Sequence, residues 1–260
     1  MTPHPIPRYL SRPSFYFLIA VLVFSLFMPA PFAVISPGPV TDLLKKGMQI
    51  SGDKALKTSG NLYSLSVYVN NPESRPPGLF VLAAWISGDS VVLPNEVVYE
   101  IGETTKSADK AAKREMANSE SIAAIAAANF LKKLNPDAPL NWSKSDIKFA
   151  MKNVGGPSAG LAFSLALIAR LKFPEIVDGR KIAVTGKIDE SGKVGGIGGI
   201  DQKLIAARKA GASIALFPRS NCADITVKPQ GLELVAVSNL TEAFHGLMSP
   251  KIAASLRCSG

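Results

Sequence analysis

An uncharged apolar run near the N-terminus is the feature that most limits how this chain can fold. It extends from Phe15 to Ile35, 21 residues, and Arg8 and Arg12 precede it. A helix of that length reaches about 30 Å, the thickness of the hydrocarbon core of a bilayer. Positive charge ahead of such a run keeps the N-terminus in the cytoplasm. We therefore predict a cytoplasmic tail over 1–14, a single transmembrane helix over 15–35, and a body on the outer side of the cell membrane.

A cleaved signal peptide is the alternative for this run, because Met28–Ala33 holds small residues that a signal peptidase could recognise. The run exceeds the usual apolar core of a signal peptide, about 7–15 residues, which favours the uncleaved anchor. If the segment is cleaved, the protein is secreted. Outside the cytoplasm Cys222 and Cys258 could form a disulfide, but only their distance in space decides this.

Composition excludes several classes of function. The net charge is +9, yet the basic residues are scattered and only 7% of residues are aromatic, so we expect no nucleic-acid partner. Histidine occurs only at His4 and His245, and cysteine only at Cys222 and Cys258. These residues cannot build a cysteine cluster or a two-histidine metal site, so we expect no metal and no cofactor.

Residues 36–144 form an N-terminal extracytoplasmic region, either a small domain of its own or a part of the next one. Its expected elements are an extended exit from the membrane at Ser36–Val40, a strand at Leu62–Val69, and a helix at Ser119–Leu134 capped by Ser119. Gly78–Ile86 is apolar without a clear type, and Lys106–Glu115 is charged, which favours a solvated segment.

Residues 145–250 alternate strands and helices, which predicts an α/β or α+β domain, and 251–260 form a C-terminal tail. The expected strands are Ile147–Val154, Lys181–Lys187, Ile214–Phe217 and Leu232–Val237. The expected helices are one that ends at Leu171, Ile200–Ala210 and Leu240–Met248, with a turn at Asp189–Gly192.

Ser158 is the candidate nucleophile. It lies in the sequence GGPSAG (155–160), between a predicted strand and an apolar helix. Glycines let a substrate backbone approach a serine hydroxyl closely, and amides at a helix start can face a developing oxyanion. Serine and proline also suit a plain helix N-terminus, so the turn alone leaves a structural role open.

Lys203 is the candidate general base. Residues at 100° intervals along the predicted helix place Lys203 on the side of Ala206, Ala207 and Ala210, a small and buried face. The opposite arc carries a polar set consisting of Asp201, Gln202, Arg208 and Lys209. Burial lowers a lysine pKa from its usual value near 10.4, and a base near neutrality needs roughly 7–8, at a cost on the order of 4 kcal/mol. The non-catalytic alternative is a lysine whose aliphatic stem is buried and whose ammonium reaches water.

Three motifs in this order and spacing resemble the proteolytic domain of Lon-type serine peptidases. They are GGPSAG, TGKIDESGKVGGIGG and GGIDQK, and the resemblance is clear from about Ile147 to Met248. It extends more weakly to SPGP, LYSLSVYV and PNEVVYEIGET. The chain is most similar to the small membrane-anchored branch of that family, which lacks the ATPase. The resemblance implies an α/β fold similar to ribosomal protein S5 domain 2, usually assembled into homo-oligomeric rings.

The resemblance also implies a Ser–Lys dyad. Ser158 matches the family nucleophile and Lys203 the family base, while Thr185 matches a threonine that helps to orient the lysine. Gly156 and Pro157 support the nucleophile turn. The implied function is a serine endopeptidase that cuts unfolded or flexible polypeptides.

The chain departs from that branch in one respect. Only about Leu134 to Lys144 separates the alanine-rich helix from the strand before GGPSAG, which is too short for the PDZ domain usually found there. Recruitment of substrate by a PDZ domain is therefore not expected. The sequence also has no GxxxxGK[ST] motif, so we expect proteolysis without ATP.

Three other interpretations stay open. Gly156–Gly160 fits GxSxG, so an esterase could pair Ser158 with His245 and with Asp201 or Asp224. A non-catalytic scaffold of the cell envelope is the second. Phosphate binding by the glycine-rich GGIGGIDQK is the third and the weakest, because the segment matches neither common phosphate-binding motif.

Overall fold

A computed structural model describes residues 11–51, 55–137, 139, 142–151 and 154–258, and a mixed six-stranded sheet is its centre. The strand order is β10-β9-β6-β3-β1-β4. Strands β3, β6, β9 and β10 run parallel, while β1 is antiparallel to both β3 and β4. The bounds are β1 Phe32–Asp42, β3 Asn61–Val69, β4 Val91–Pro94, β6 Lys181–Val184, β9 Ile214–Pro218 and β10 Glu233–Val237.

Helices cover both faces of this sheet, because neighbouring strand residues point to opposite sides. Ile182 and Val184 of β6 belong to one apolar core, with α4 (Thr105–Leu134), α5 (Gly160–Leu171) and α7 (Leu240–Met248). Ala183, between them, belongs to a second core, with α6 (Ile200–Lys209). The catalytic candidates therefore lie on different layers, Ser158 beside α5 and Lys203 on α6.

Shorter elements complete the described chain. Two small antiparallel pairs join β2 (Met48–Ile50) to β5 (Ile147–Phe149), and β7 (Lys187–Ile188) to β8 (Val194–Gly195). The remaining helices of three residues or more are α1 Arg12–Phe27, η1 Leu43–Gly47, α2 Gly78–Ile86, α3 Asn95–Val98, η2 Lys144–Asp146, η3 Pro174–Ile176, η4 Arg219–Asp224 and α8 Pro250–Ser255.

The apolar run at the N-terminus does not form the continuous helix predicted over 15–35. Helix α1 ends at Phe27, and the chain is a β-strand from Phe32 onward. Proline explains the stop, since Pro29 and Pro31 lack the amide that a helix needs and bias the preceding residue toward an extended backbone. Among residues 11–51, 55–137 and the later described segments, no helix combines the length and apolarity needed to cross a bilayer. The predicted tail over 1–14 lies mostly outside the described residues.

Helix α4 is nearly twice as long as predicted. It begins at Thr105, and Thr104 caps it in a reciprocal capping box with Ser107. The prediction that Ser119 caps the helix is therefore wrong, and Ser119 is a buried residue in the middle of α4. The charged segment Lys106–Glu115, predicted to be solvated, forms the first turns of α4 and is mostly exposed.

Most other element predictions are confirmed, with changes at the ends. The Leu62–Val69 strand is β3, and α5, α6 and α7 end at or within one residue of the predicted position. The predicted Ile147–Val154 strand is shorter, since only Ile147–Phe149 pairs with β2, and 152–153 lie outside the described residues. Gly78–Ile86, whose sequence predicts no clear type, is the helix α2.

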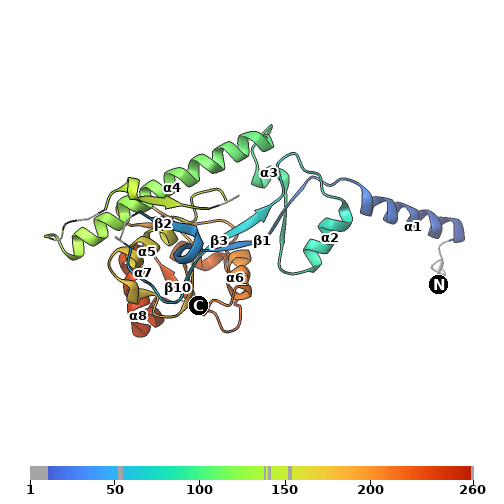
Figure 1. Cartoon of the computed structure of the whole chain (residues 1–260). Helices are drawn as coiled ribbons and strands as arrows, with labels where there is room; N and C mark the ends of the chain where they lie inside the picture. The colour runs from blue at the N-terminus through green and yellow to red at the C-terminus, as the bar shows by residue number, and fades with distance from the viewer. Residues whose placement is uncertain (1–10, 52–54, 138, 140–141, 152–153, 259–260) are drawn as a thin grey trace.

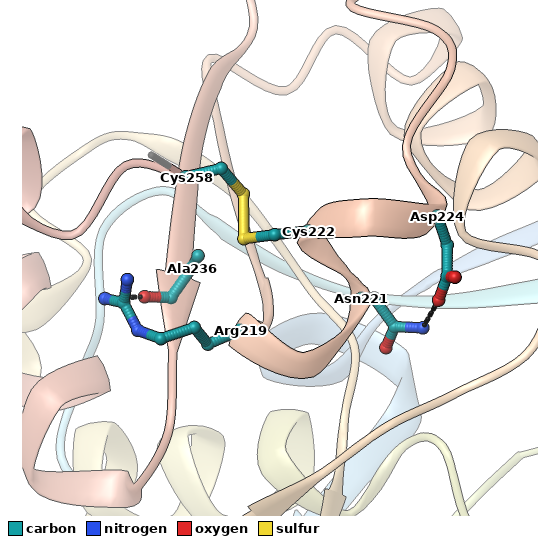
Figure 2. Close-up of a disulfide and its surroundings, with 6 residues drawn as sticks. All are labelled: Arg219, Asn221, Cys222, Asp224, Ala236 and Cys258. Carbon is teal, nitrogen blue, oxygen red and sulfur yellow. Dashed lines mark hydrogen bonds between the residues drawn. A yellow bond between two sulfur atoms is a disulfide. The ribbon is translucent and has the colours of Figure 1, made fainter. Parts of the chain in front are cut away.

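One sheet contains strands from both halves of the chain. Strand β3 pairs with β6 over Asn61–Ser64 and Lys181–Val184, which joins the 36–144 region to the domain predicted at 145–250. The C-terminus is also tied to the sheet: Cys222 in η4 and Cys258 form a disulfide with a Cα–Cα distance of 5.7 Å. Figure 2 shows this disulfide beside Arg219, whose guanidinium donates to the carbonyl of Ala236 in β10.

Candidate active site

The GGPSAG turn connects the β5 side of the molecule to helix α5, and helix α4 holds it from outside. The amide of Gly156 donates to the carbonyl of Ala112 at 3.0 Å. Gly156 has a φ of +86°, which favours glycine. A Cβ on the neighbouring Gly155 would lie 2.5 Å from the Cβ of Ala112. Both glycines are therefore needed, one for the turn and the other for the close approach of α4.

A second bond from α4 reaches the same turn. The Ser119 hydroxyl donates to the carbonyl of Pro157 at 3.2 Å. Ala159 occupies the N-cap position of α5, so the half-buried Ser158 lies immediately before the start of the helix. The turn thus presents Ser158 beside the positive end of the α5 dipole, where developing negative charge is stabilised.

The carbonyl of Ser158 is fixed by two donors that follow strand β6. The amide of Gly186 donates to it at 2.7 Å, and the hydroxyl of Thr185 at 3.2 Å. Thr185 is fully buried. The resemblance implies that Thr185 helps to orient the lysine, and this role stays a prediction. The hydrogen bond described here connects its hydroxyl to the backbone of the nucleophile.

Lys203 lies at the end of the first turn of α6 and is only 3% exposed. Burial is the main cause that lowers the pKa of Lys203, and the positive charge of Lys187 lowers it further, to about 8. The predicted buried face of α6 is confirmed for Lys203, Ala206 and Ala207. The prediction is wrong for Gln202, which was placed on the polar, exposed side of α6 but is only 4% exposed. Residues other than those of the sheet therefore also cover this helix.

The glycine-rich segment before α6 serves the packing of this helix. Gly199 has a φ of +64°, and a Cβ there would lie 2.9 Å from Cγ1 of Val67 in β3. Its carbonyl accepts the amide of Lys203 at 3.1 Å. Asn221 holds the same segment through two bonds with the backbone of Ile197, at 3.0 and 2.9 Å. These contacts give the glycines a structural reason that does not involve phosphate.

Ser158 and Lys203 line one small cavity of about 100 Å³. The two candidates, far apart in sequence, are thereby brought to the same space. Val154 and Gly155 contribute one wall, and β1 and β3 contribute the other. The wall from these strands is formed by Pro39, Ser66, Val67 and Tyr68.

The residues of the esterase alternative lie elsewhere. His245 is exposed on α7 and stacks edge-on against the ring of Phe244. Asp201 accepts from the amides of Thr226 and Val227, and Asp224 accepts from Asn221 at 2.7 Å. The cavity lining described above contains none of these three residues. In the part of the chain that the structure describes, no group of three or more His, Cys, Asp or Glu side chains could hold a metal ion.

Two parts of the site were not predicted. Ala112 and Ser119 support the nucleophile turn from α4, and no motif in the sequence marks either residue. The wall of β1 and β3 was indicated only indirectly, since SPGP and LYSLSVYV share the weaker resemblance. A bulge between Pro37 and Val40 brings β1 close to β3 there, and a Cβ on Gly38 would lie 2.6 Å from the backbone of Ser66.

Comparison with known proteins relates the chain to one protein family. The family model of the Lon protease (S16) C-terminal proteolytic domain matches residues 85–249. A mitochondrial Lon protease homolog of Neurospora crassa is 30% identical over 210 residues, covering 75% of this chain and 18% of that protein. The Lon protease of Roseiflexus castenholzii is 35% identical over 100 residues, covering 37% of this chain and 12% of that protein.

The chain thus spans less than a fifth of the length of these two relatives. The family match, in contrast, covers more than half of this chain and includes both Ser158 and Lys203. It begins within α2, so it also includes α4, which supports the nucleophile turn. The chain belongs to the family of Lon protease proteolytic domains.

Proposed function

We propose that this protein is a serine endopeptidase that cuts unfolded or flexible polypeptides without ATP, with Ser158 as nucleophile and Lys203 as general base. The observation that carries the proposal is the shared cavity of these two side chains, with Lys203 buried and its pKa lowered to about 8. At pH 7 roughly a tenth of such an amine is neutral, and at pH 8 about half. A neutral amine is available as a base in the physiological range.

The reaction follows from these groups. Neutral Lys203 takes the proton of the Ser158 hydroxyl as the oxygen attacks the scissile carbonyl, which forms a tetrahedral oxyanion and a lysine ammonium. Backbone amides of the turn before α5 are the candidate donors to that oxyanion. The ammonium then gives its proton to the leaving amine, and an acyl-enzyme remains. Water attacks the ester in the same manner, with Lys203 again accepting and returning a proton.

The volume of the cavity and the residues that line it support a flexible polypeptide as substrate. A space of about 100 Å³ holds a part of one residue and cannot enclose a folded domain. The wall from β1 and β3 includes Tyr68, which is 62% exposed and accessible to an extended chain. The 260 residues contain no P-loop motif, which supports a substrate that is already flexible.

We further propose that the protein acts at a membrane, with its catalytic part outside the cytoplasm. The Cys222–Cys258 disulfide supports an oxidising compartment, because thiols in the cytosol are kept reduced. The exposed apolar side chains of α1 support attachment to lipid. Assembly into a homo-oligomeric ring, which the resemblance implies, stays a prediction that sedimentation or mass photometry would test.

The test of the peptidase proposal is cleavage of a permanently unfolded protein by the full chain in mild detergent, without ATP. We expect Ser158→Ala and Lys203→Ala to abolish cleavage and His245→Ala to leave it unchanged. Retention of activity in Lys203→Ala with its loss in His245→Ala would favour an esterase-like triad. A folded wild-type protein that neither cleaves nor reacts with a serine-directed phosphonate would support the scaffold.

A further inference from the structure

Helices α1 and α2 leave the main body of the molecule and lie next to each other at one end of it (Figure 1). We call these two elements the apolar helix pair. Neither helix contains a buried residue, and neither has a charged side chain after Arg12. In α2 every residue from Gly78 to Ile86 is apolar or glycine, and Trp85 is 70% exposed.

The pair is held together at its base by backbone bonds. The amide of Gly78 donates to the carbonyl of Met28 at 3.0 Å, and that of Ala30 donates to Pro76 at 2.9 Å. A Cβ on Gly78 would lie 2.7 Å from the carbonyl oxygen of Ser25, so the start of α2 touches the last turn of α1. Whatever environment surrounds the end of α1 therefore also reaches α2.

The distribution of apolar residues indicates what that environment is. A helix that docks on a protein has one apolar stripe and a polar opposite face, whereas α1 and α2 are apolar on all sides. Two hydroxyls bond to the backbone of the preceding turn: Ser25 in α1 donates to Leu22, and Ser87, directly after α2, donates to Ala84, both at 2.7 Å. Such internal bonds are required where no water is available.

We propose that α2 is a second lipid-embedded element, which enters the same bilayer as α1 and places Trp85 near the headgroups. Nine helical residues extend only about 14 Å, so α2 lies in one leaflet. Tryptophan favours the interface between acyl chains and water. This inference rests on the proposed membrane attachment and is independent of the peptidase chemistry.

Two insertion points would also orient the catalytic part. Asp89, just after α2, forms an ion pair of 2.6 Å with Lys209 at the end of α6. Lys203 lies on the same helix, about one and a half turns earlier. The lipid-embedded helix is thus connected directly to the helix that carries the proposed base.

The test uses Trp85 fluorescence in the full chain, reconstituted in phosphatidylcholine–phosphatidylglycerol vesicles with and without brominated acyl chains. The protein has two tryptophans, and Trp142 packs partly buried against the core of the body. In Trp142→Phe we expect bromolipid to quench the remaining emission. The matched variant Trp85→Phe should lose most of this quenching, so the difference from wild type gives the same answer if Trp142→Phe folds poorly.

A second test introduces a charged side chain into the apolar helix pair. Leu82→Glu should lower quenching of Trp85, because transfer of its side chain into lipid becomes less favourable by roughly tenfold or more. Ile101→Glu, an equally drastic change at a residue 98% exposed outside the pair, should have no effect. Equal quenching in the two variants would count against the inference.

Absence of bromolipid quenching in wild type and in Trp142→Phe would overturn the inference that α2 is embedded in lipid. Quenching by aqueous acrylamide would then mean that α2 lies in water. Protection from both quenchers would mean that a second copy of the chain covers α2. Because fluorescence is read without substrate, an inactive protein that is still quenched would contradict the peptidase proposal alone.

Discussion

The amide of Gly156 donates a 3.0 Å hydrogen bond to the carbonyl of Ala112, which joins the turn around Ser158 to the long helix α4. Gly155 approaches the same residue so closely that an added Cβ would lie 2.5 Å from that of Ala112. Helix α4 therefore acts as a rigid support behind the nucleophile. The position of Ser158 depends on a helix surface 46 residues earlier in the chain, counted from Ala112.

This packing predicts a compensating pair of substitutions. Gly155→Ala should destabilise the protein by about 1–3 kcal/mol through overpacking and should lower activity. Ala112→Gly costs about 1 kcal/mol of helix propensity alone but makes room for the new methyl group. The double variant should therefore be more stable than the sum of the two single changes, as measured by chemical denaturation.

Gly198→Ala is the control for that pair, since a Cβ there meets no heavy atom within 4 Å. It should change stability little. Strictly additive effects of Gly155→Ala and Ala112→Gly would show that the two sites do not touch.

Thr185 is expected to position the nucleophile through the carbonyl of Ser158. Thr185→Val removes the 3.2 Å bond and leaves the bond from Gly186. A hydrogen bond of about 1.5 kcal/mol corresponds to roughly tenfold in rate, and we expect that loss in kcat with little change in KM. Thr185→Ser keeps the hydroxyl and should recover most of the rate. Retention of the rate in Thr185→Val with its loss in Thr185→Ser would point to packing of the methyl group instead.

Burial of Lys203 should destabilise the folded protein at neutral pH. Its pKa is 10.5 in the unfolded chain and about 8 in the folded one, so below pH 8 the folded state carries a charged, desolvated amine at a cost of about 3 kcal/mol. As pH rises from 8 toward 10.5, the folded protein releases this proton while the unfolded chain keeps it, and stability increases.

Lys203→Met removes this pH dependence while keeping similar volume. The variant should be more stable than wild type by up to about 3 kcal/mol at pH 7, with the difference declining to near zero above pH 10.5. Urea denaturation across this pH range measures it. A variant less stable than wild type at pH 7 would mean that the ammonium has favourable partners in the folded state.

Lys187 is predicted to tune the base, since its positive charge is the second cause that lowers the pKa of Lys203. Lys187→Met should raise that pKa and move the pH–rate profile to higher pH, with less activity at pH 7. High salt should shrink the difference between variant and wild type. Lys251→Met makes the same change in net charge on α8 and should leave the profile in place.

Local patterns predicted much of the fold. The helices α6 and α7 and strands β3 and β9 follow from apolar periodicity, which depends on neighbouring residues alone. The same reasoning placed Lys203 on a buried face correctly and Gln202 on an exposed face wrongly. A single helix wheel cannot indicate how many neighbours surround the helix.

The wrong predictions for α4 and for the 15–35 run have a common cause. The first half of α4 is rich in charge and has no broad apolar face, yet it packs through Ala112 against glycines. The 15–35 run has the composition of a membrane helix, yet after two prolines its last residues form strand β1 and pair with β4. In both cases the deciding contact is made by residues distant in sequence, which periodicity does not reveal.

The most direct test of the account is the pH dependence of Ser158 phosphonylation by a fluorophosphonate, which needs no knowledge of the natural substrate. If neutral Lys203 takes the proton of Ser158, the rate of labelling in wild type should rise with pH through a midpoint near 8. Lys203→Met should react at a small fraction of that rate, and Ser158→Ala should not be labelled at position 158. Unchanged labelling in Lys203→Met, with the same midpoint, would contradict the proposed Ser–Lys dyad.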